Sequence, residues 1–258
     1  MQGGISARGL STDLRTGLAF CTRLPFVGGV SATDSDVARA SWTFPIAGAL
    51  VGLIGAFAYW LADRLGLPPF VSATLAVAAT MLATGCLHED GLADTVDGFG
   101  GGGTAERKLE IMRDSRIGAY GASALFISLM LRAGAIASLV EPHLVASALF
   151  AAHAGARAAL PVFMRHLPAA RRDGLLADAG RPPSGMASIA VLLGLIALVI
   201  GLGFGGALTA VALLTLGVGP LAWISIRQVG GQTGDVLGAV EQAGEILILL
   251  VATSWLQA

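Results

Sequence analysis

The stretch TFPIAGALVGLIGAFAYWLA, residues 43–62, decides the fold class of this chain, because it carries no charged residue over its whole length. A helix of about 20 predominantly apolar residues can cross the hydrocarbon core of a bilayer. The rest of the chain has the same character: 55% of its 258 residues are hydrophobic and 13% are charged, with a mean hydropathy of +0.75. Soluble domains carry about 25% charged residues. The sequence therefore predicts an integral membrane protein.

Six further apolar segments follow, at residues 70–87, 118–140, 142–163, 186–203, 205–224 and 238–256. Only a weak glycine-rich break separates 186–203 from 205–224, and Glu241 and Glu245 weaken the start of the last segment. We expect an all-α, polytopic membrane helix bundle of about seven transmembrane helices, with residues 1–258 forming a single integral-membrane domain. The 36 glycines suit close helix packing in a bilayer.

Basic residues predict the orientation of the bundle. Segments 1–41, 88–117 and 164–185 hold four each and 225–237 holds one, whereas the alternate connections hold only Arg64. The positive-inside rule then places the N-terminus and the three long loops, with the active-site chemistry they carry, on the cytoplasmic side of the inner membrane. Within the cytoplasmic segment 1–41, residues 8–21 form either an amphipathic interfacial helix or a solvated lead-in to the first span.

Charge and cysteine content exclude two classes of protein. The net charge of −1 gives no reason to expect a nucleic-acid partner. Cys21 and Cys86 show no metal-binding spacing, and we expect both to be free thiols rather than part of a disulfide scaffold.

The stretch LHEDGLADTVDGFGGGG, residues 87–103, is the densest acidic region. If a helix continues from the second apolar segment, Asp90, Asp94 and Asp97 share one face within about 60° of arc. A solvated stripe could tolerate this repulsion, but unpaired charge beside an apolar span is costly. A divalent cation relieves it, and oxygen ligands favour Mg²⁺, with Mn²⁺ as the alternative. Gly91 and Gly98 are expected to leave room for a bulky ligand.

Basic residues follow the acidic stretch at once. Arg113 and Arg116 lie in RKLEIMRDSRIGAYG, where a phosphate-bearing substrate bridged by metal would use both signs of charge. Positive-inside bias explains some of these charges without a substrate. Asp114, between the two arginines, is either a further metal ligand or an ion-pair partner.

Ionisable residues inside the later spans are functional candidates by default. Arg157 either binds substrate phosphate or extends its charge to the membrane surface. Asp235 follows a glycine-rich turn and could contact substrate or a second metal. Glu241 and Glu245 share a helix face, so we expect a metal or an arginine beside them. Arg132 has no obvious partner in the sequence.

These residues resemble the pattern of cobalamin synthases, the adenosylcobinamide-GDP ribazoletransferase family. The pattern H-x-D-G-L-x-D-x-x-D-G fits from His88 to Gly98, and E-x-M-x-D-S-R-x-G-x-x-G fits from Glu110 to Gly121. CTRLPF at 21–26 and GGQTGDVLGAVEQAGE at 230–245 are similar to two further family segments. The chain departs from the pattern in the extra charge of Glu89 and in Ala156, where serine is expected before Arg157.

The resemblance implies a reaction and its participants. A hydroxyl of α-ribazole, or of its 5′-phosphate, attacks adenosylcobinamide-GDP, GMP leaves, and adenosylcobalamin or its 5′-phosphate forms. In this reading Asp90, Asp94 and Asp97 hold Mg²⁺, Asp114 is the favoured base, with Asp97 and His88 as alternatives, and His88 more readily caps or orients the site. The expected substrate-binding residues are Arg113, Arg116, Arg157, Asp235 and Gly98. Lipid surrounds the bundle, and the sequence leaves self-association open.

Three other classes of membrane protein share part of this pattern. DTVDG matches the opening of the CDP-alcohol phosphotransferase motif, but FGGG follows where that motif continues differently. An intramembrane prenyltransferase would show two separated aspartate-rich motifs. A transporter would place its ionisable residues near mid-span, whereas most of them here are expected at one surface.

Overall fold

The computed structural model describes residues 7–25, 34–171 and 179–257, and within these ranges the regular elements are helices. Phe26 of the CTRLPF segment and Arg172 of the third basic segment lie outside them. The elements are α1 (Ala7–Cys21), α2 (Asp34–Ala40), η2 (Ser41–Thr43), α3 (Phe44–Arg64), α4 (Pro69–Thr84), α5 (Leu87–Gly101), α6 (Ala105–Ile111), α7 (Ala119–Leu139), α8 (Pro142–His166), α10 (Ser184–Val229) and α11 (Gly234–Trp255). The predicted all-α membrane helix bundle is confirmed.

The helix boundaries follow the apolar segments closely. Five helices of the described chain are long and apolar enough to cross a membrane, or up to six if the bent pair α4–α5 counts as one span. Two elements separate this count from the expected seven. The segment 70–87 is a 16-residue helix that turns before it can span alone, and α10 is counted once although it holds both predicted segments, 186–203 and 205–224.

Helix α10 consists of two helices joined at a kink, and each holds one of the two predicted segments. At about 1.5 Å per residue its 46 residues would far exceed a bilayer core of about 30 Å. Gly203 interrupts it with φ 70° and ψ 174°, a conformation that glycine adopts without steric cost. Before the break Gly194 packs against Ala158 of α8, and after it Gly205 packs against Trp255 of α11. The predicted segments on either side of the break are therefore packed against different helices.

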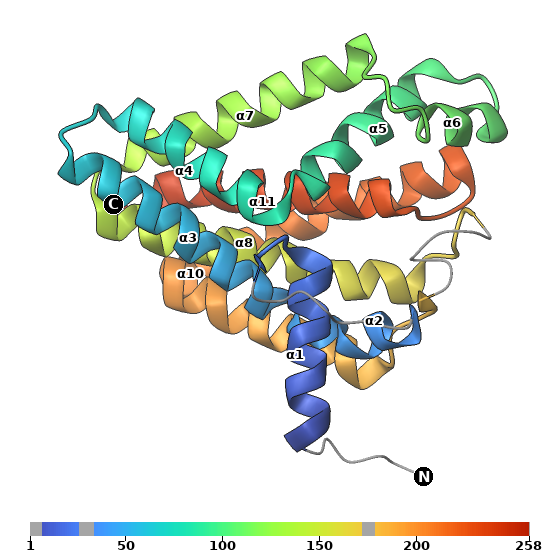
Figure 1. Ribbon diagram of the computed structural model, residues 1–258, viewed down its shortest axis with the longest axis horizontal. Helices are drawn as coiled ribbons and strands as arrows, with labels where there is room; N and C mark the ends of the chain where they lie inside the picture. The colour runs from blue at the N-terminus through green and yellow to red at the C-terminus, as the bar shows by residue number, and fades with distance from the viewer. Residues whose placement is uncertain (1–6, 26–33, 172–178, 258) are drawn as a thin grey trace.

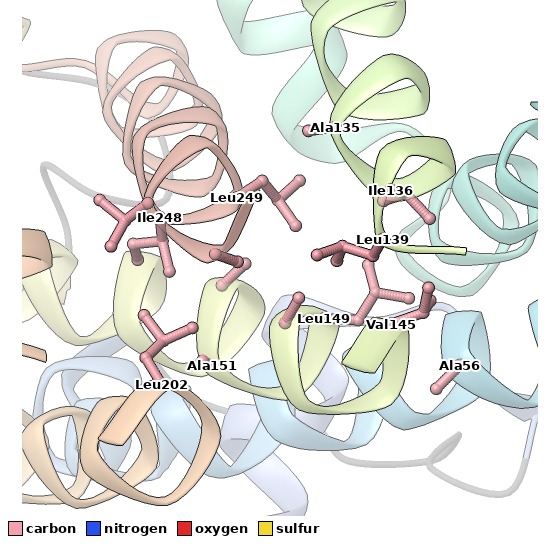
Figure 2. Packing of buried hydrophobic residues seen from close by; sticks show 14 of the residues in the cluster. Ala56, Ala135, Ile136, Leu139, Val145, Leu149, Ala151, Leu202, Ile248 and Leu249 are labelled. Carbon is pink, nitrogen blue, oxygen red and sulfur yellow. The ribbon is translucent and has the colours of Figure 1, made fainter. Parts of the chain in front are cut away.

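Helix α8 lies at the centre of the bundle, between α3, α10 and α11 (Figure 1). Small residues allow this packing: a Cβ at Gly48 of α3 would lie 2.1 Å from the carbonyl oxygen of His153, and one at Gly52 would lie 2.4 Å from that of Leu149. Without a hydrophobic driving force between helices in lipid, such close backbone approach provides the van der Waals contact. Figure 2 shows the apolar core around α8, which includes Leu149 of α8, Leu202 of α10 and Ile248 of α11.

The chain bends by 90° between α4 and α5. Gly85 and Cys86 both adopt left-handed backbone conformations, with φ 65° and 58°. The expectation that residues 88–98 form a helix is confirmed, but the expectation that this helix continues the second span is wrong. The reason is local: the two left-handed residues end α4 with a C-cap turn, and α5 starts again in a new direction. This bend places the acidic stretch against α7 and α11 (Figure 1).

Three segments with predicted cytoplasmic charge meet at one end of the molecule. Lys108 of α6 contacts the side chain of Gln228 at the end of α10. Arg171 donates to the carbonyl of Leu109 at 3.2 Å, and the amide of Ala170 donates to the carbonyl of Gln232 at 2.8 Å. Loops far apart in the sequence therefore form one surface beside α5.

The N-terminal segment forms a helix that is anchored to the bundle. Asp13 of α1 is buried and accepts hydrogen bonds from Arg39 at 2.9 Å and from the indole nitrogen of Trp42 at 3.1 Å. Residues 8–21 are therefore helical, as an interfacial helix must be. That this helix lies at a membrane surface stays a prediction.

Candidate active site

A cavity of about 450 Å³ lies between the bend of α4–α5, helix α6 and helix α7. It brings together four of the charged residues expected at the site: Asp90 and Asp94 of α5, and Arg113 and Asp114 of the turn after α6. The other lining residues are Met81, Cys86, Glu89, Ala93, Met112, Ser115, Ile117, Leu125 and Leu129. Carboxylates and a guanidinium in a cavity that is also lined by several apolar side chains are typical of a site for a small, charged or polar ligand.

Asp90 and Asp94 have the properties expected of cation ligands. They are one helical turn apart on α5 and both line the cavity. Neither makes a side-chain hydrogen bond or ion pair with another described residue. Two carboxylates that face one cavity without a protein partner repel each other, and a bound cation would relieve that repulsion.

Asp97, the third residue of the predicted stripe, does not line the cavity. Its side chain is 8% exposed and accepts hydrogen bonds from the amides of Gly118 at 2.7 Å and Gly121 at 2.9 Å. These amides belong to the first turn of α7, where unpaired N–H groups and the helix dipole favour a carboxylate. Asp97 therefore joins α5 to α7 through these hydrogen bonds. Its role as a metal ligand stays a prediction, and only the remaining lone pairs of its two oxygens could bind an ion.

Asp114 forms an ion pair with Arg116. The Arg116 Nη2 atom lies 2.6 Å from Asp114 Oδ2, and the two side chains are 37% and 87% exposed for Asp114 and Arg116. These hydrogen bonds from Arg116 lower the pKa of Asp114 to about 2, so the carboxylate stays ionised at neutral pH. Of the two readings of Asp114, the structure shows the ion pair, while the position of Asp114 in the cavity wall keeps it close to any ligand there.

Asp235 is placed against α5 but outside the cavity lining. Its Oδ2 accepts a hydrogen bond from Thr233 at 3.1 Å and lies 3.5 Å from Arg171. A Cβ added to Gly91 would lie 2.8 Å from the Asp235 carbonyl oxygen, so the two helices touch at this point. The structure therefore pairs Asp235 with a basic loop residue, close to the acidic helix.

The expectation that Gly91 and Gly98 leave room for a ligand is wrong. A Cβ on Gly91 would meet the backbone of α11, and one on Gly98 would lie 2.5 Å from the Met112 side chain and 3.0 Å from the Lys108 carbonyl oxygen. Protein atoms fill the space beside both glycines. Gly98 thus allows α6 to pack closely against α5. Met112 and Lys108 fill the space beside Gly98, so a substrate could not reach this glycine from there.

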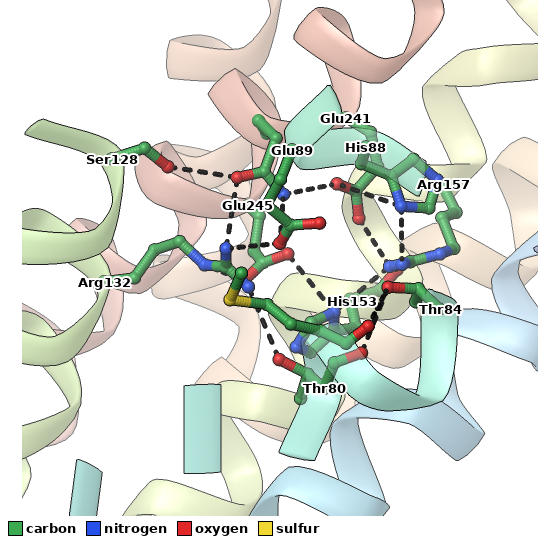
Figure 3. A network of polar contacts seen from close by, with 12 residues as sticks. Thr80, Thr84, His88, Glu89, Ser128, Arg132, His153, Arg157, Glu241 and Glu245 are labelled. Carbon is green, nitrogen blue, oxygen red and sulfur yellow. Dashed lines mark hydrogen bonds and ion pairs between the residues drawn. The ribbon is translucent and has the colours of Figure 1, made fainter. Parts of the chain in front are cut away.

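A buried network of charged groups lies among α5, α7, α8 and α11 (Figure 3), and it includes Glu89 of the cavity lining. Arg132 Nη1 lies 2.7 Å from Glu89 Oε1, and Arg132 Nε lies 2.7 Å from Glu245 Oε1. Arg157 lies 2.5 Å from Glu241. All five of these side chains are at most 6% exposed. The partner expected for Glu241 and Glu245 is therefore an arginine in each case.

Two predicted site residues belong to this network rather than to the cavity wall. His88 Nδ1 lies 3.4 Å from Arg157 and 3.8 Å from Glu241. Arg157 is 1% exposed, so the alternative in which it extends to the membrane surface is wrong. The catalytic role of His88 and the phosphate-binding role of Arg157 stay predictions, and in this structure both side chains contact protein charges instead of the cavity.

Sequence reasoning missed Glu89 as a member of the site. Glu89 lines the cavity and also binds Arg132, so it connects the cavity to the buried network. Two signals could have found this pair: Arg132 lies within an apolar span without a partner, and Glu89 is an extra charge at the end of another span. Each of these two residues needs a partner of opposite charge, because burying an unpaired charge is costly.

The chain is similar to known proteins over almost its whole length. The family model of cobalamin-5-phosphate synthase matches residues 13–253. A protein of Bradyrhizobium diazoefficiens named adenosylcobinamide-GDP ribazoletransferase is 54% identical over 96% of this chain and 95% of its own. Proteins of the same name from Mesorhizobium japonicum and Ralstonia nicotianae are 49% and 41% identical, covering 96% and 92% of this chain and 95% and 93% of their own. No solved structure matches the chain.

Proposed function

The chain belongs to the cobalamin-5-phosphate synthase family, and from this premise we propose that it is an adenosylcobinamide-GDP ribazoletransferase. It transfers the adenosylcobinamide phosphate group to α-ribazole or to α-ribazole 5′-phosphate and releases GMP. The observation that carries the proposal is the cavity that joins Asp90, Asp94, Arg113 and Asp114, within a chain that the family model covers almost entirely.

Asp90 and Asp94 would hold Mg²⁺, or Mn²⁺ in its place. Their unpartnered carboxylates on one cavity wall fit the all-oxygen coordination of these ions. A bound ion supplies charge stabilisation to a pyrophosphate and to the departing phosphate. Asp97 would contribute less, because both of its oxygens already accept amide hydrogen bonds.

The remaining cavity residues provide positioning and proton transfer. The Arg113 guanidinium lines the cavity and would bind phosphate oxygens of the substrate. Asp114 accepts the proton of the ribazole hydroxyl as its oxygen forms a bond to the phosphorus next to the corrinoid side chain. The bond from that phosphorus to GMP breaks, and GMP leaves with the electron pair. Arg116, paired with Asp114, keeps this carboxylate ionised at neutral pH.

The bundle would lie in the inner membrane as a multi-pass protein with a cytoplasmic N-terminus. The apolar spans support the membrane location, and the meeting of the basic segments around α6, Arg171 and Gln228 at one end supports a single cytoplasmic face. The nucleotide-bearing substrate and GMP would then enter and leave from the cytoplasm.

Transport and CDP-alcohol phosphotransfer are the weaker functions for this chain. A transporter is expected to carry ionisable residues near mid-span. Arg132, Glu89 and Glu245 are buried in this bundle as well, so this feature does not separate a transporter from a transferase. Family membership and the relatives that share nearly the whole chain favour the transferase.

A direct assay tests the proposal. The purified protein in lipid nanodiscs is incubated with adenosylcobinamide-GDP, α-ribazole and Mg²⁺, and mass spectrometry follows adenosylcobalamin and GMP. Formation of both products in equal amounts, and their loss on adding a chelator, is the expected result. Absence of both products at every metal and substrate concentration would reject the function.

A further inference from the structure

The cavity lining combines two kinds of chemistry, which come from different elements. The acidic residues are Asp90 and Asp94 of α5 and Asp114 of the turn after α6. The apolar residues include Met81 of α4 and Leu125 and Leu129 of α7. Leu125 and Leu129 are one helical turn apart, so they present one continuous apolar surface. A ligand that fills the whole cavity therefore combines an apolar body with a polar group.

Of the two proposed substrates, only the acceptor fits this description. α-Ribazole joins an apolar aromatic base, a methylated benzimidazole, to a ribose that carries several hydroxyl groups. The cavity volume of about 450 Å³ lies within the range of about 300–1,000 Å³ of small-molecule pockets. The donor carries a corrinoid ring, a guanosine and a pyrophosphate, which together are far larger than one nucleoside.

We infer that the aromatic base of the acceptor nucleoside binds to the apolar end of the cavity, which is formed by Met81, Leu125 and Leu129. Glu89 accepts a hydrogen bond from the ribose of the same nucleoside. This inference rests on the proposed function and names the substrate subsite within it. With the base at the apolar end, the ribose hydroxyls face Asp90, Asp94 and Asp114. The donor phosphates then meet the attacking hydroxyl beside these carboxylates.

Glu89 provides the second observation behind this assignment. Its side chain is 6% exposed and lines the cavity, and its Oε2 atom has no hydrogen-bond partner among the described residues. Its Oε1 atom is bound by Arg132 Nη1 at 2.7 Å, which fixes the orientation of the carboxylate. A buried acceptor without a donor is costly, and a ribose hydroxyl would supply that donor. Glu89 is thus a specificity-determining residue, and Arg132 positions it.

Cys86 gives a direct binding assay. It lines the cavity and is exposed, whereas Cys21 is fully buried, so a maleimide reagent added to the native protein should modify Cys86. With Mg²⁺ present, α-ribazole at ten times its Kd should slow this modification by about 10-fold, because roughly one site in eleven is then free. Protection by adenosylcobinamide-GDP together with no protection by α-ribazole would overturn the inference.

Two variants separate the subsite from the rest of the enzyme. Leu129→Trp fills the apolar end and should raise the KM for α-ribazole by about 10-fold or more, with the KM for adenosylcobinamide-GDP unchanged. Leu131→Trp is the matched control, since Leu131 is 40% exposed on the same helix and does not line the cavity. Glu89→Gln should also raise the KM for α-ribazole. The Tm of this variant is measured as well, because the substitution removes the ion pair with Arg132.

The possible failures are distinguishable. If wild-type protein forms adenosylcobalamin but Leu129→Trp keeps the normal KM for α-ribazole, the subsite assignment is wrong and the proposed function stands. If wild-type protein forms no product and α-ribazole gives no protection of Cys86, the function and the subsite are both rejected.

Discussion

Arg132 and Glu89 form a buried ion pair, with 2.7 Å between Nη1 and Oε1, that joins the middle of α7 to the start of α5. Arg132 also binds Glu245 of α11, so one guanidinium connects three helices (Figure 3). Glu89, which lines the cavity, is therefore held in place by two buried side chains, whereas Asp90 and Asp94 on the same helix make no such contact among the described residues.

Replacing Arg132 with Gln should strongly destabilise the protein. Removing one partner of a buried ion pair leaves an uncompensated charge, which costs about 3–5 kcal/mol. Thermal unfolding in detergent should show a clearly lower Tm. The control is Arg107→Gln, which removes an ion pair to Glu110 whose side chains are 64% and 66% exposed and which should contribute only about 0–1 kcal/mol. Equal Tm values for the two variants would contradict the stabilising role of the network.

Replacing Asp90 or Asp94 with Asn should abolish most turnover without loss of stability. Metal-based charge stabilisation is worth several kcal/mol, so kcat should fall by about 100-fold or more, while the Tm without substrate stays near the wild-type value. Turnover as a function of Mg²⁺ concentration is the measurement. Near-wild-type activity of both variants at saturating Mg²⁺ would sink the metal assignment.

Gly121→Ala should disrupt the contact between α5 and α7. Its Cβ would lie 2.4 Å from Asp97 Oδ2 and 2.8 Å from the Ala93 carbonyl oxygen, so the carboxylate could no longer accept both amides. We expect a lower Tm and reduced activity. Gly134→Ala on the same helix is the matched control: no atom lies within 4 Å of its Cβ position, and alanine should stabilise the helix by about 1 kcal/mol. A Gly121→Ala variant as stable as Gly134→Ala would contradict the role given to Asp97.

Replacing Asp114 with Asn should lower kcat by about 10²–10⁴-fold and leave the Mg²⁺ requirement nearly unchanged, as expected for loss of a proton acceptor. Because the pKa of Asp114 is lowered to about 2, this carboxylate should not titrate between pH 5 and 8, and its protonation should reduce the wild-type rate only at far lower pH. Arg116→Ala should move that acidic loss of activity to higher pH. If Asp114→Asn regains its kcat at high Mg²⁺, Asp114 is a metal ligand, and the base must be sought at Asp97 or His88.

The orientation of the bundle predicts the outcome of reporter fusions. A reporter active only in the cytoplasm should be active when fused after Gly103 and silent when fused at Pro142, because the basic residues lie in the segments on the side of Gly103. An active reporter at Pro142 would mean that the orientation is inverted or that the spans are miscounted.

The amino-acid sequence was enough to predict the membrane class, the approximate position of most helices and the chemical character of the site. These depend on local properties: runs of apolar residues, the i and i+4 spacing of Asp90 and Asp94, and the costs of unpaired charge that required partners for Glu241 and Glu245. The family resemblance also came from contiguous motifs, and the comparisons confirm it.

Which charges face the cavity and which are buried could not be predicted from the sequence, because this depends on how the helices pack. Asp97 has the spacing of a ligand but binds the first turn of α7, because the 90° bend at Cys86 brings α5 beside that helix. Glu89 and Arg132 are 43 positions apart in the chain and meet only through packing. A sequence pattern gives the face of one helix on which a residue lies, whereas the partner opposite that face depends on how all the helices pack together.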